Sequence, residues 1–266
     1  MIDAAQILQE TYPNFKVVIN NKLVLNFLKK LLHEDDCNNV IRHYQHLGGY
    51  DFLDNFLRDL NFNYEIGNNA LHHIPKTGRL LIVANHPIGT LDGLALVKLI
   101  RSVRPGVRIV ANRLLLNIDP LQSVFLPVDV LTDKKSLKGT YKTMLDALKN
   151  EETIIIFPAG EVSRITPVGV RDGEWQTGFI KLAKKTRSNI LPIHVSARNS
   201  ALFYCMSTLY KPLGSVLLFK EMFNKKNMTI KFNIGSPISY KDMAAGTEVD
   251  KQLSRRLRQH VLELGK

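Results

Sequence analysis

Cysteine and long apolar runs are both scarce in this sequence, and each absence excludes a class of protein. Only two cysteines, Cys37 and Cys205, occur among the 266 residues, and they lack the CxxC spacing of zinc or redox motifs. Two are too few for a disulfide framework, so a reducing compartment is the simpler expectation. No window approaches the ~18 uninterrupted apolar residues of a membrane-spanning helix. The opening stretch MIDAAQILQETYPNFK lacks the features of a secretory signal, which leaves a soluble or peripheral protein.

Acidic residues are also scarce relative to basic ones. Lys and Arg number 36 against 24 Asp and Glu, which gives a formal net charge of +12. Such an excess favours an anionic partner: nucleic acid, an anionic membrane surface or an acidic carrier protein. A recognition helix, an RNP-type motif and zinc spacing are all missing, which argues against nucleic acid. The apolar share of 45% is ordinary for a folded protein, so disorder of the whole chain is excluded.

Apolar periodicity divides the chain into two parts. A helical period runs through the first 61 residues, most clearly in 22–33 and 51–60. From about residue 62, helix-like stretches alternate with apolar strand-like stretches, namely NYEIG, RLLIVAN, VRIVAN, TIIIFPAG, NILPIHVSA and MTIKFNIGSPI. This alternation predicts an α/β fold in which helices flank a central, mostly parallel sheet. We expect a helical N-terminal extension over residues 1–61 and one domain over residues 62–266.

The stretch VANHPIGTLDG places a histidine and an aspartate at the junction of a strand and a helix. His86 follows the strand-like run, and Asp92 lies at the start of the next helix. Ligand sites in open α/β sheets gather at the carboxyl ends of strands. A carboxylate bonded to one imidazole nitrogen fixes the tautomer and makes the other nitrogen a better base. The alternative is that Asp92 caps the helix and His86 is an ordinary loop residue.

A second stretch, IIIFPAGEVSR, again joins a strand to a turn with proline and glycine. Gly160 permits a positive φ or a close backbone approach. Glu161, Ser163 and Arg164 bring polar groups to the same edge of the sheet. Taken alone, this stretch is equally well explained as a turn with a solvated charge cluster.

Together the two stretches resemble a known family. NHPIGTLDG is similar to the first signature block of the glycerolipid and lysophospholipid acyltransferase superfamily, and FPAGEVSR is similar to its FPEGT-type block. NILPIHV and KFNIGSPI resemble later strands of that superfamily, so the resemblance covers roughly residues 62–240. The NHPxGxxDG form resembles the bacterial subgroup called hemolysin-like, which contains acyltransferases for amino-acid lipids such as ornithine lipids.

The resemblance implies that His86 is a general base oriented by Asp92. A hydroxyl of a lysolipid acceptor would attack the thioester of acyl carrier protein or coenzyme A, which serves as cosubstrate. No acyl-enzyme, no metal and no other cofactor are implied. We expect the substrates to be contacted by residues of the loops at this edge, namely Asn85, Gly89, Asn112, Arg113, Pro158, Gly160, Glu161 and Arg164.

Three departures from the family pattern bear on the acceptor. Five residues separate His86 from Asp92 where the family usually has four, and Gly89 is expected to absorb the extra one. Val130 and Val162 stand where the family usually has arginines for the acceptor's phosphate. The remaining basic candidates are Arg113, Arg164 and Lys134.

These departures favour an acceptor without a phosphate. Glu161 would repel a phosphate but could pair with an amine, so a lyso-amino-acid lipid such as lyso-ornithine lipid is expected. The alternative is a 1-acylglycerol-3-phosphate acyltransferase that makes phosphatidic acid. An alternative of another class is a non-catalytic lipid-binding or nucleic-acid-binding protein.

Four further features have a functional and a structural interpretation. Trp175 either shapes the edge of the site or lies in the core. His194 alternates onto one face of its strand and is interpreted as a packed histidine. The stretches 22–33 and 51–60 either lie in a membrane interface, with Lys29 and Lys30 near anionic headgroups, or pack on the domain. The sequence thus predicts a cytoplasmic protein, peripheral on the inner face of the cell membrane.

Overall fold

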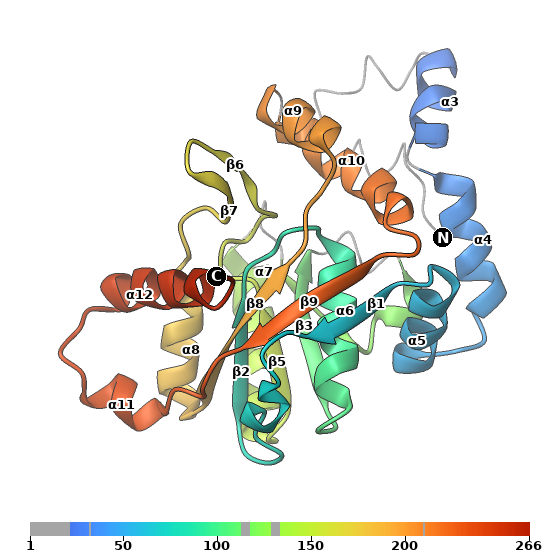
Figure 1. Cartoon of the computed structure of the whole chain (residues 1–266). Helices are drawn as coiled ribbons and strands as arrows, with labels where there is room; N and C mark the ends of the chain where they lie inside the picture. The colour runs from blue at the N-terminus through green and yellow to red at the C-terminus, as the bar shows by residue number, and fades with distance from the viewer. Residues whose placement is uncertain (1–21, 32, 113–117, 129–133, 210) are drawn as a thin grey trace.

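A central sheet of seven strands organises the described structure (Figure 1). The computed structural model describes residues 22–31, 33–112, 118–128, 134–209 and 211–266. In spatial order the strands are β1 (Asn63–Ile66), β9 (Thr229–Ile234), β8 (Asn189–Ser196), β2 (Leu80–Ala84), β5 (Thr153–Ile156), β3 (Val107–Asn112) and β4 (Phe125–Val128). All neighbours are parallel except β8 and β9. The predicted α/β fold with a mostly parallel sheet is confirmed.

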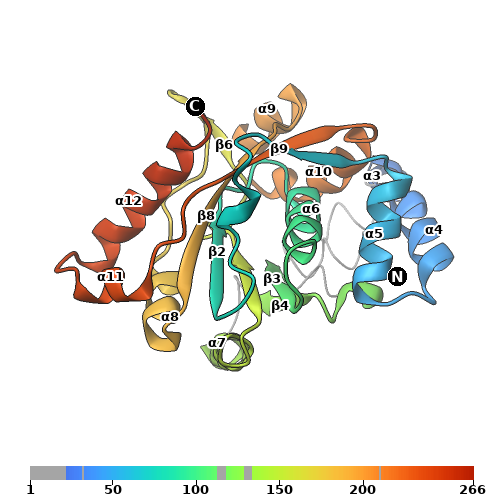
Figure 2. The ribbon, with the colours of Figure 1, turned by 60° about the horizontal axis from the view of Figure 1, so that its bottom comes forward.

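Helices cover both faces of this sheet, as Figure 2 shows. The helices are α3 (Lys22–Leu31), α4 (Glu34–Tyr44), α5 (Gly49–Asp59), α6 (Thr90–Arg101), α7 (Lys134–Lys149), α8 (Gly178–Thr186), α9 (Ala201–Leu209), α10 (Lys211–Asn224), α11 (Tyr240–Ala245) and α12 (Asp250–Glu263), with short 3-10 turns η2 (Ala70–His73) and η4 (Asp119–Leu121). Helices α5 and α6 lie on one face, and α7, α8 and α12 lie on the other.

Strand β2 shows why its sequence is apolar throughout. Its side chains alternate between the two faces, and each face is covered by helices. Leu80, Ile82 and Ala84 pack in the layer of α5 and α6. Leu81 and Val83 pack in the layer of α7, α8 and α12. All five residues are buried, so this strand is a fixed central element from which the following loop departs.

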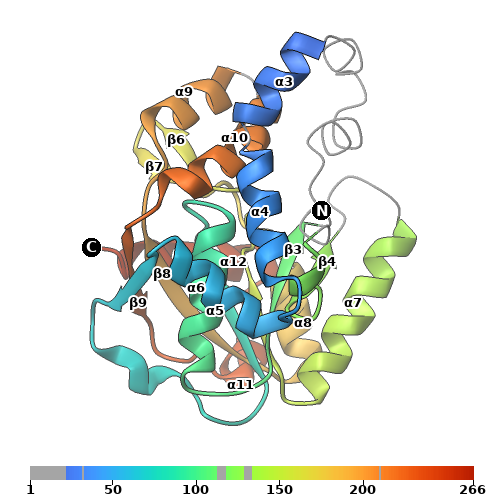
Figure 3. The same cartoon turned by 90° about the vertical axis from the view of Figure 1, so that its right-hand side faces the viewer.

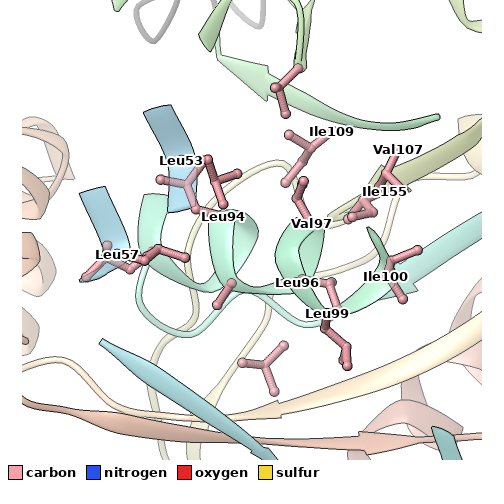
Figure 4. Close-up of a cluster of buried hydrophobic side chains, with 14 of the residues drawn as sticks. Leu53, Leu57, Leu94, Leu96, Val97, Leu99, Ile100, Val107, Ile109 and Ile155 are labelled. Atoms are coloured by element: carbon pink, nitrogen blue, oxygen red, sulfur yellow. The ribbon is translucent and has the colours of Figure 1, made fainter. Parts of the chain in front are cut away.

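The described part of the N-terminal segment is helical, as expected, and shares the core of the sheet. Leu53 and Leu57 of α5 face α6, where Leu94 lies close to them (Figure 4). Phe52 and Phe56 of the same helix are also buried. Of the two interpretations of residues 51–60, packing on the domain is therefore the one observed.

Two elements beside the sheet were not anticipated from the sequence. A short antiparallel hairpin consists of β6 (Arg164–Thr166) and β7 (Gly169–Arg171). Helices α9 and α10 form a pair anchored by a buried carboxylate. Glu221 accepts hydrogen bonds from the backbone and hydroxyl of Ser200 at 2.8 and 2.6 Å, and from Lys225 at 2.7 Å. Within the described ranges, no helix is long and apolar enough to cross a membrane.

Truncation of Leu53 tests whether α5 belongs to the core. Its side chain is 0% exposed, so Leu53→Ala should lower the free energy of unfolding by about 2–5 kcal/mol, measured by urea denaturation. The matched control is Leu23→Ala in α3, where the side chain is 81% exposed and the change should stay within about 0.5 kcal/mol. Equal effects of the two substitutions would contradict the placement of α5.

Candidate active site

The pairing of β2 with β5 brings the two signature stretches together. The strands are parallel neighbours with Val83 opposite Ile156, so their following loops leave the sheet at the same edge. His86 lies in the loop after β2, and Phe157 begins the turn after β5. The two stretches are thus in contact although they are far apart in the sequence.

The loop after β2 folds so that His86 and Asp92 meet. Nδ1 of His86 lies 2.9 Å from Oδ1 of Asp92, and neither atom has another hydrogen-bonding partner within the described residues. Oδ2 of Asp92 accepts a hydrogen bond of 2.9 Å from the backbone of Ile88. Gly89 has a φ of 91° just before α6 and accommodates the longer spacing, as the sequence suggested. Asp92 therefore both contacts the imidazole and closes the loop that carries it.

An aromatic ring packs on one face of the imidazole. The rings of His86 and Phe157 are stacked, with centroids 3.9 Å apart and planes 17° apart. A Cβ on Gly93 would come within 3.4 Å of the Phe157 ring and 2.7 Å of Cδ1 of Ile109, so any larger residue would force the Ile109 side chain to move. With Nδ1 toward Asp92 and one face stacked, Nε2 is the nitrogen that can reach a substrate. The His86 side chain is 19% exposed, which leaves it accessible from the open edge.

Burial and neighbouring charges shift the pKa of His86 in opposite directions. Burial alone would lower the pKa of His86 because it disfavours the charged ring. The charge and hydrogen bonding of Asp92, together with the charge of Asp172, outweigh burial and raise the pKa of His86 above its ordinary value. The site therefore favours an imidazole that accepts a proton.

The turn after β5 pairs two residues that the sequence placed as separate substrate contacts. Nε of Arg164 donates to Oε2 of Glu161 at 3.0 Å, and its Nη1 donates to the carbonyl of Ser207 at 3.1 Å. Val162 is buried among apolar residues of α9 and α10. Val130, in the other position of a family arginine, lies outside the described residues. The charge of Glu161 is thus already compensated by Arg164.

A model of the acyltransferase family matches residues 6–262. The chain belongs to the acyltransferase family. This acyltransferase is 30% identical over 248 residues to the lyso-glycine lipid O-acyltransferase of Bacteroides thetaiotaomicron, with 90% of this chain and 89% of the relative covered. It is 29% identical to the lyso-glycine lipid O-acyltransferase of Phocaeicola vulgatus, with 90% and 87% covered. The superfamily indicated by the two signature stretches is confirmed.

The fold has a solved counterpart. The crystal structure of the 1-acyl-sn-glycerophosphate acyltransferase PlsC from Thermotoga maritima matches the acyltransferase with a TM-score of 0.52 and 17% sequence identity. The match covers 98% of this chain and 95% of the other. Helices around a mostly parallel sheet are therefore shared with PlsC.

Asn85 has a structural contact in place of the expected substrate contact. Its Nδ2 donates to the carbonyl of Val195 at 2.9 Å, and its Oδ1 accepts from the Val195 backbone at 2.7 Å. The residue is buried, and it joins the end of β2 to β8. Asn85 thus has a structural role in the fold, and its contact with the substrate stays a prediction.

The other expected substrate contacts occupy different surroundings. Gly160 has a φ of 71° and lies in an open turn, as expected for a backbone that a ligand can approach. Pro158 is buried beneath the same turn, and Asn112 is exposed at the end of β3. Arg113 lies outside the described residues. The backbone of Ser163 donates to the carbonyl of His86 at 2.7 Å, so the turn that carries Gly160, Glu161 and Arg164 lies against the loop of His86.

One residue beside His86 gave no signal in the sequence. Asp172 is 1% exposed, and its carboxylate accepts from the His86 backbone at 3.1 Å and from Nε1 of Trp175 at 3.0 Å. The stretch RDGEW that contains it has the composition of an ordinary turn. Trp175 is buried, so the core interpretation holds for its ring. His194 is largely buried, and burial lowers its pKa to about 4, in agreement with a packed histidine.

Proposed function

We propose that this acyltransferase transfers a fatty acyl group from a thioester to the hydroxyl of a lysolipid, with His86 as general base. The observation that supports this proposal is the imidazole held between Asp92 and Phe157 at the carboxyl end of β2. A proton on Nδ1 directed at Asp92 leaves a lone pair on Nε2. The acyl thioester of acyl carrier protein or coenzyme A is the cosubstrate, and the scheme uses no further cofactor.

The proposed reaction has two steps. Nε2 of His86 takes the proton of the acceptor hydroxyl while the oxygen attacks the thioester carbonyl. The resulting imidazolium is stabilised by the adjacent carboxylate of Asp92. The tetrahedral intermediate then expels the thiolate, which takes the proton from Nε2. The products are the ester and the free thiol, and His86 returns to its neutral form.

Removal of the base tests the mechanism. His86→Ala should lower kcat by about 10²- to 10⁴-fold, the usual contribution of a general base. His86 must be neutral to act, so kcat/KM should rise with pH through a midpoint above the ordinary histidine value. Asp92→Asn removes the charge that raises the pKa, so the midpoint should move to lower pH while kcat also falls.

The exposed His72 provides the matched control for these measurements. His72→Ala should leave kcat, the pH midpoint and Tm unchanged. The general-base assignment fails if His86→Ala keeps more than about a tenth of the wild-type kcat, because the loss of activity would then be smaller than a general base usually contributes.

We propose that the acceptor is a lyso-amino-acid lipid, as in the names of the two relatives. A phosphate monoester carries about −1.5 to −2 charges near pH 7 and is best held by unpaired arginine forks. Two nitrogens of Arg164 already donate to Glu161 and Ser207, and Val162 has no donor. This turn therefore suits a headgroup with less negative charge, such as that of a lyso-glycine or lyso-ornithine lipid.

Competition between acceptors tests this proposal. The purified protein should show a higher kcat/KM for lyso-glycine or lyso-ornithine lipid than for lysophosphatidic acid, offered together with one acyl thioester. Glu161→Gln releases the charge of Arg164, so it should shift the ratio of kcat/KM toward lysophosphatidic acid. Glu174→Gln, at an exposed ion pair with Arg255, is the control and should leave the ratio unchanged. A wild-type preference for lysophosphatidic acid would support the phosphatidic-acid alternative instead.

We also propose that the protein is peripheral on the inner, cytoplasmic face of the cell membrane. Five of the seven exposed large apolar side chains in the described ranges form what we call the apolar rim, namely Leu23, Ile165, Val168, Leu202 and Leu209. They belong to α3, the β6–β7 hairpin and α9, which stand at one end of the molecule in Figures 1 and 3. Arg164 joins the hairpin to α9 through Ser207, and Ser163 at the base of the hairpin bonds the carbonyl of His86. A lipid substrate would reach the site from this end.

Two valines of similar exposure test the membrane contact. Val168 in the hairpin is 65% exposed, and Val249 before α12 is 60% exposed but lies away from the rim. In flotation with anionic vesicles, Val168→Asp should weaken binding and Val249→Asp should not. Binding should also weaken with added salt, because the net charge of +12 contributes to it. Equal binding of both variants, or equal binding to neutral vesicles at high salt, would contradict the proposal.

A further inference from the structure

A second buried carboxylate, that of Asp172, holds the backbone of His86, whereas Asp92 contacts its ring. Oδ1 of Asp172 accepts hydrogen bonds from the His86 backbone, at 3.1 Å, and from the hydroxyl of Ser163. Its Oδ2 accepts from Nε1 of Trp175 at 3.0 Å. Three donors thus converge on a side chain that has almost no contact with solvent.

The same residues close a ring around the His86 peptide. The backbone of Ser163 donates to the carbonyl of His86 at 2.7 Å, while the Ser163 hydroxyl donates to Asp172. Asp172 in turn accepts from the His86 N–H. Both polar groups of the His86 backbone are therefore bound, one by Ser163 and one by Asp172. The direction of the imidazole depends on this ring as well as on Asp92.

The C-terminal helix supports the ring from outside. Arg258 of α12 donates to the carbonyl of Asp172, and the hydroxyl of Ser254 donates to the carbonyl of Trp175 at 3.0 Å. The segment that carries Asp172 is thus tied to a helix packed on the sheet. A carboxylate held in this way cannot turn away from His86 without breaking several contacts.

The partners of Asp172 suit its ionised form. The His86 and Trp175 groups are N–H donors that cannot accept a hydrogen bond, so they match a carboxylate and not a protonated acid. Burial raises the pKa of Asp172 above its ordinary value, and the hydrogen bonds from Ser163, His86 and Trp175 oppose that rise. The negative charge of Asp172 also contributes to the raised pKa of His86.

We propose that Asp172 is a positioning residue for acyl transfer, which fixes the His86 backbone and supplies a second carboxylate beside the imidazolium. This inference rests on the proposed role of His86 as the base. Residues that hold a reactive side chain in its orientation commonly contribute about 10- to 100-fold to activity. Asp172 does so without touching the substrate, because the carboxylate lies behind the backbone of the loop.

Several charged groups lie on the elements packed around the loop of His86 and bear on the titration of its imidazole. They are Asp92 of α6, Asp172 after β7, Arg258 of α12, the Glu161–Arg164 pair after β5 and the Glu221–Lys225 pair of α10. The last two are internally compensated ion pairs. Arg258 contacts the backbone carbonyl of Asp172. Asp172 is therefore the second carboxylate whose removal should change the titration of His86.

Asp172→Asn tests the proposal, because the amide keeps the size but places an N–H against a donor. It should lower kcat by about 10- to 100-fold with little change in KM for either substrate. The acid limb of kcat/KM should move to lower pH. The same shift should be seen in the NMR titration of the His86 imidazole, whose signal among the eight histidines is identified with His86→Ala.

Two further variants test the positioning role of Asp172 if Asp172→Asn does not fold. Ser163→Ala and Trp175→Phe each remove one donor to Asp172, and each should lower kcat and shift the His86 titration. Ser188→Ala is the matched control: its hydroxyl is also buried but pairs with Thr186 at the end of α8, so only Tm should fall.

The possible results separate this inference from the proposed function. The inference is overturned if folded Asp172→Asn, or the two donor variants in its place, keep kcat within about twofold of the wild type and leave the His86 titration unchanged. A lower Tm with an unchanged kcat and an unchanged His86 titration would likewise show that Asp172 has a purely structural role. If His86→Ala remains active, the proposed function fails, while the NMR titration still reports whether Asp172 acts on the imidazole.

Discussion

The parallel pairing of β2 with β5 is the constraint on which the candidate site depends. Val83 lies opposite Ile156, so the chain leaves both strands at the same edge and His86 arrives beside Phe157. Helix α6 then returns along one face of the sheet, and its Gly93 lets the aromatic ring lie close to the helix. The stacked ring, the imidazole and Asp92 are consequences of this single register. A slip of one residue would move Phe157 to the other face.

The site combines a local contact with distant ones. His86 and Asp92 are joined within one short loop, and Gly89 gives that loop its backbone turn. Asp172 arrives from a segment 86 residues further along the chain and binds the backbone of the same histidine. Local geometry thus sets which nitrogen faces Asp92, and the tertiary contact sets where the loop stands on the sheet.

This division explains what the sequence could predict. The strand pattern predicted the sheet because β2 is apolar on both faces, and the histidine–aspartate pair was visible because both members lie in one stretch. Asn85 was assigned to the substrate because nothing nearby in the sequence shows the backbone of β8 that it bonds. Asp172 was missed because its partners are brought together only by the tertiary fold. Glu161 and Arg164 were both selected, but their pairing depends on the conformation of the turn.

The hydrogen bond between Ser163 and Asp172 has a consequence for how this fold can vary. The two residues are nine positions apart and enclose the β6–β7 hairpin, so the bond separates the tip of the hairpin from the loop of His86. Insertions or deletions between Ser163 and Asp172 would change the length of an exposed hairpin at small entropic cost. The hydrogen bond between these two residues would stay in place. The hairpin is therefore a module whose size and composition can diverge between relatives while the chemistry beneath it stays the same.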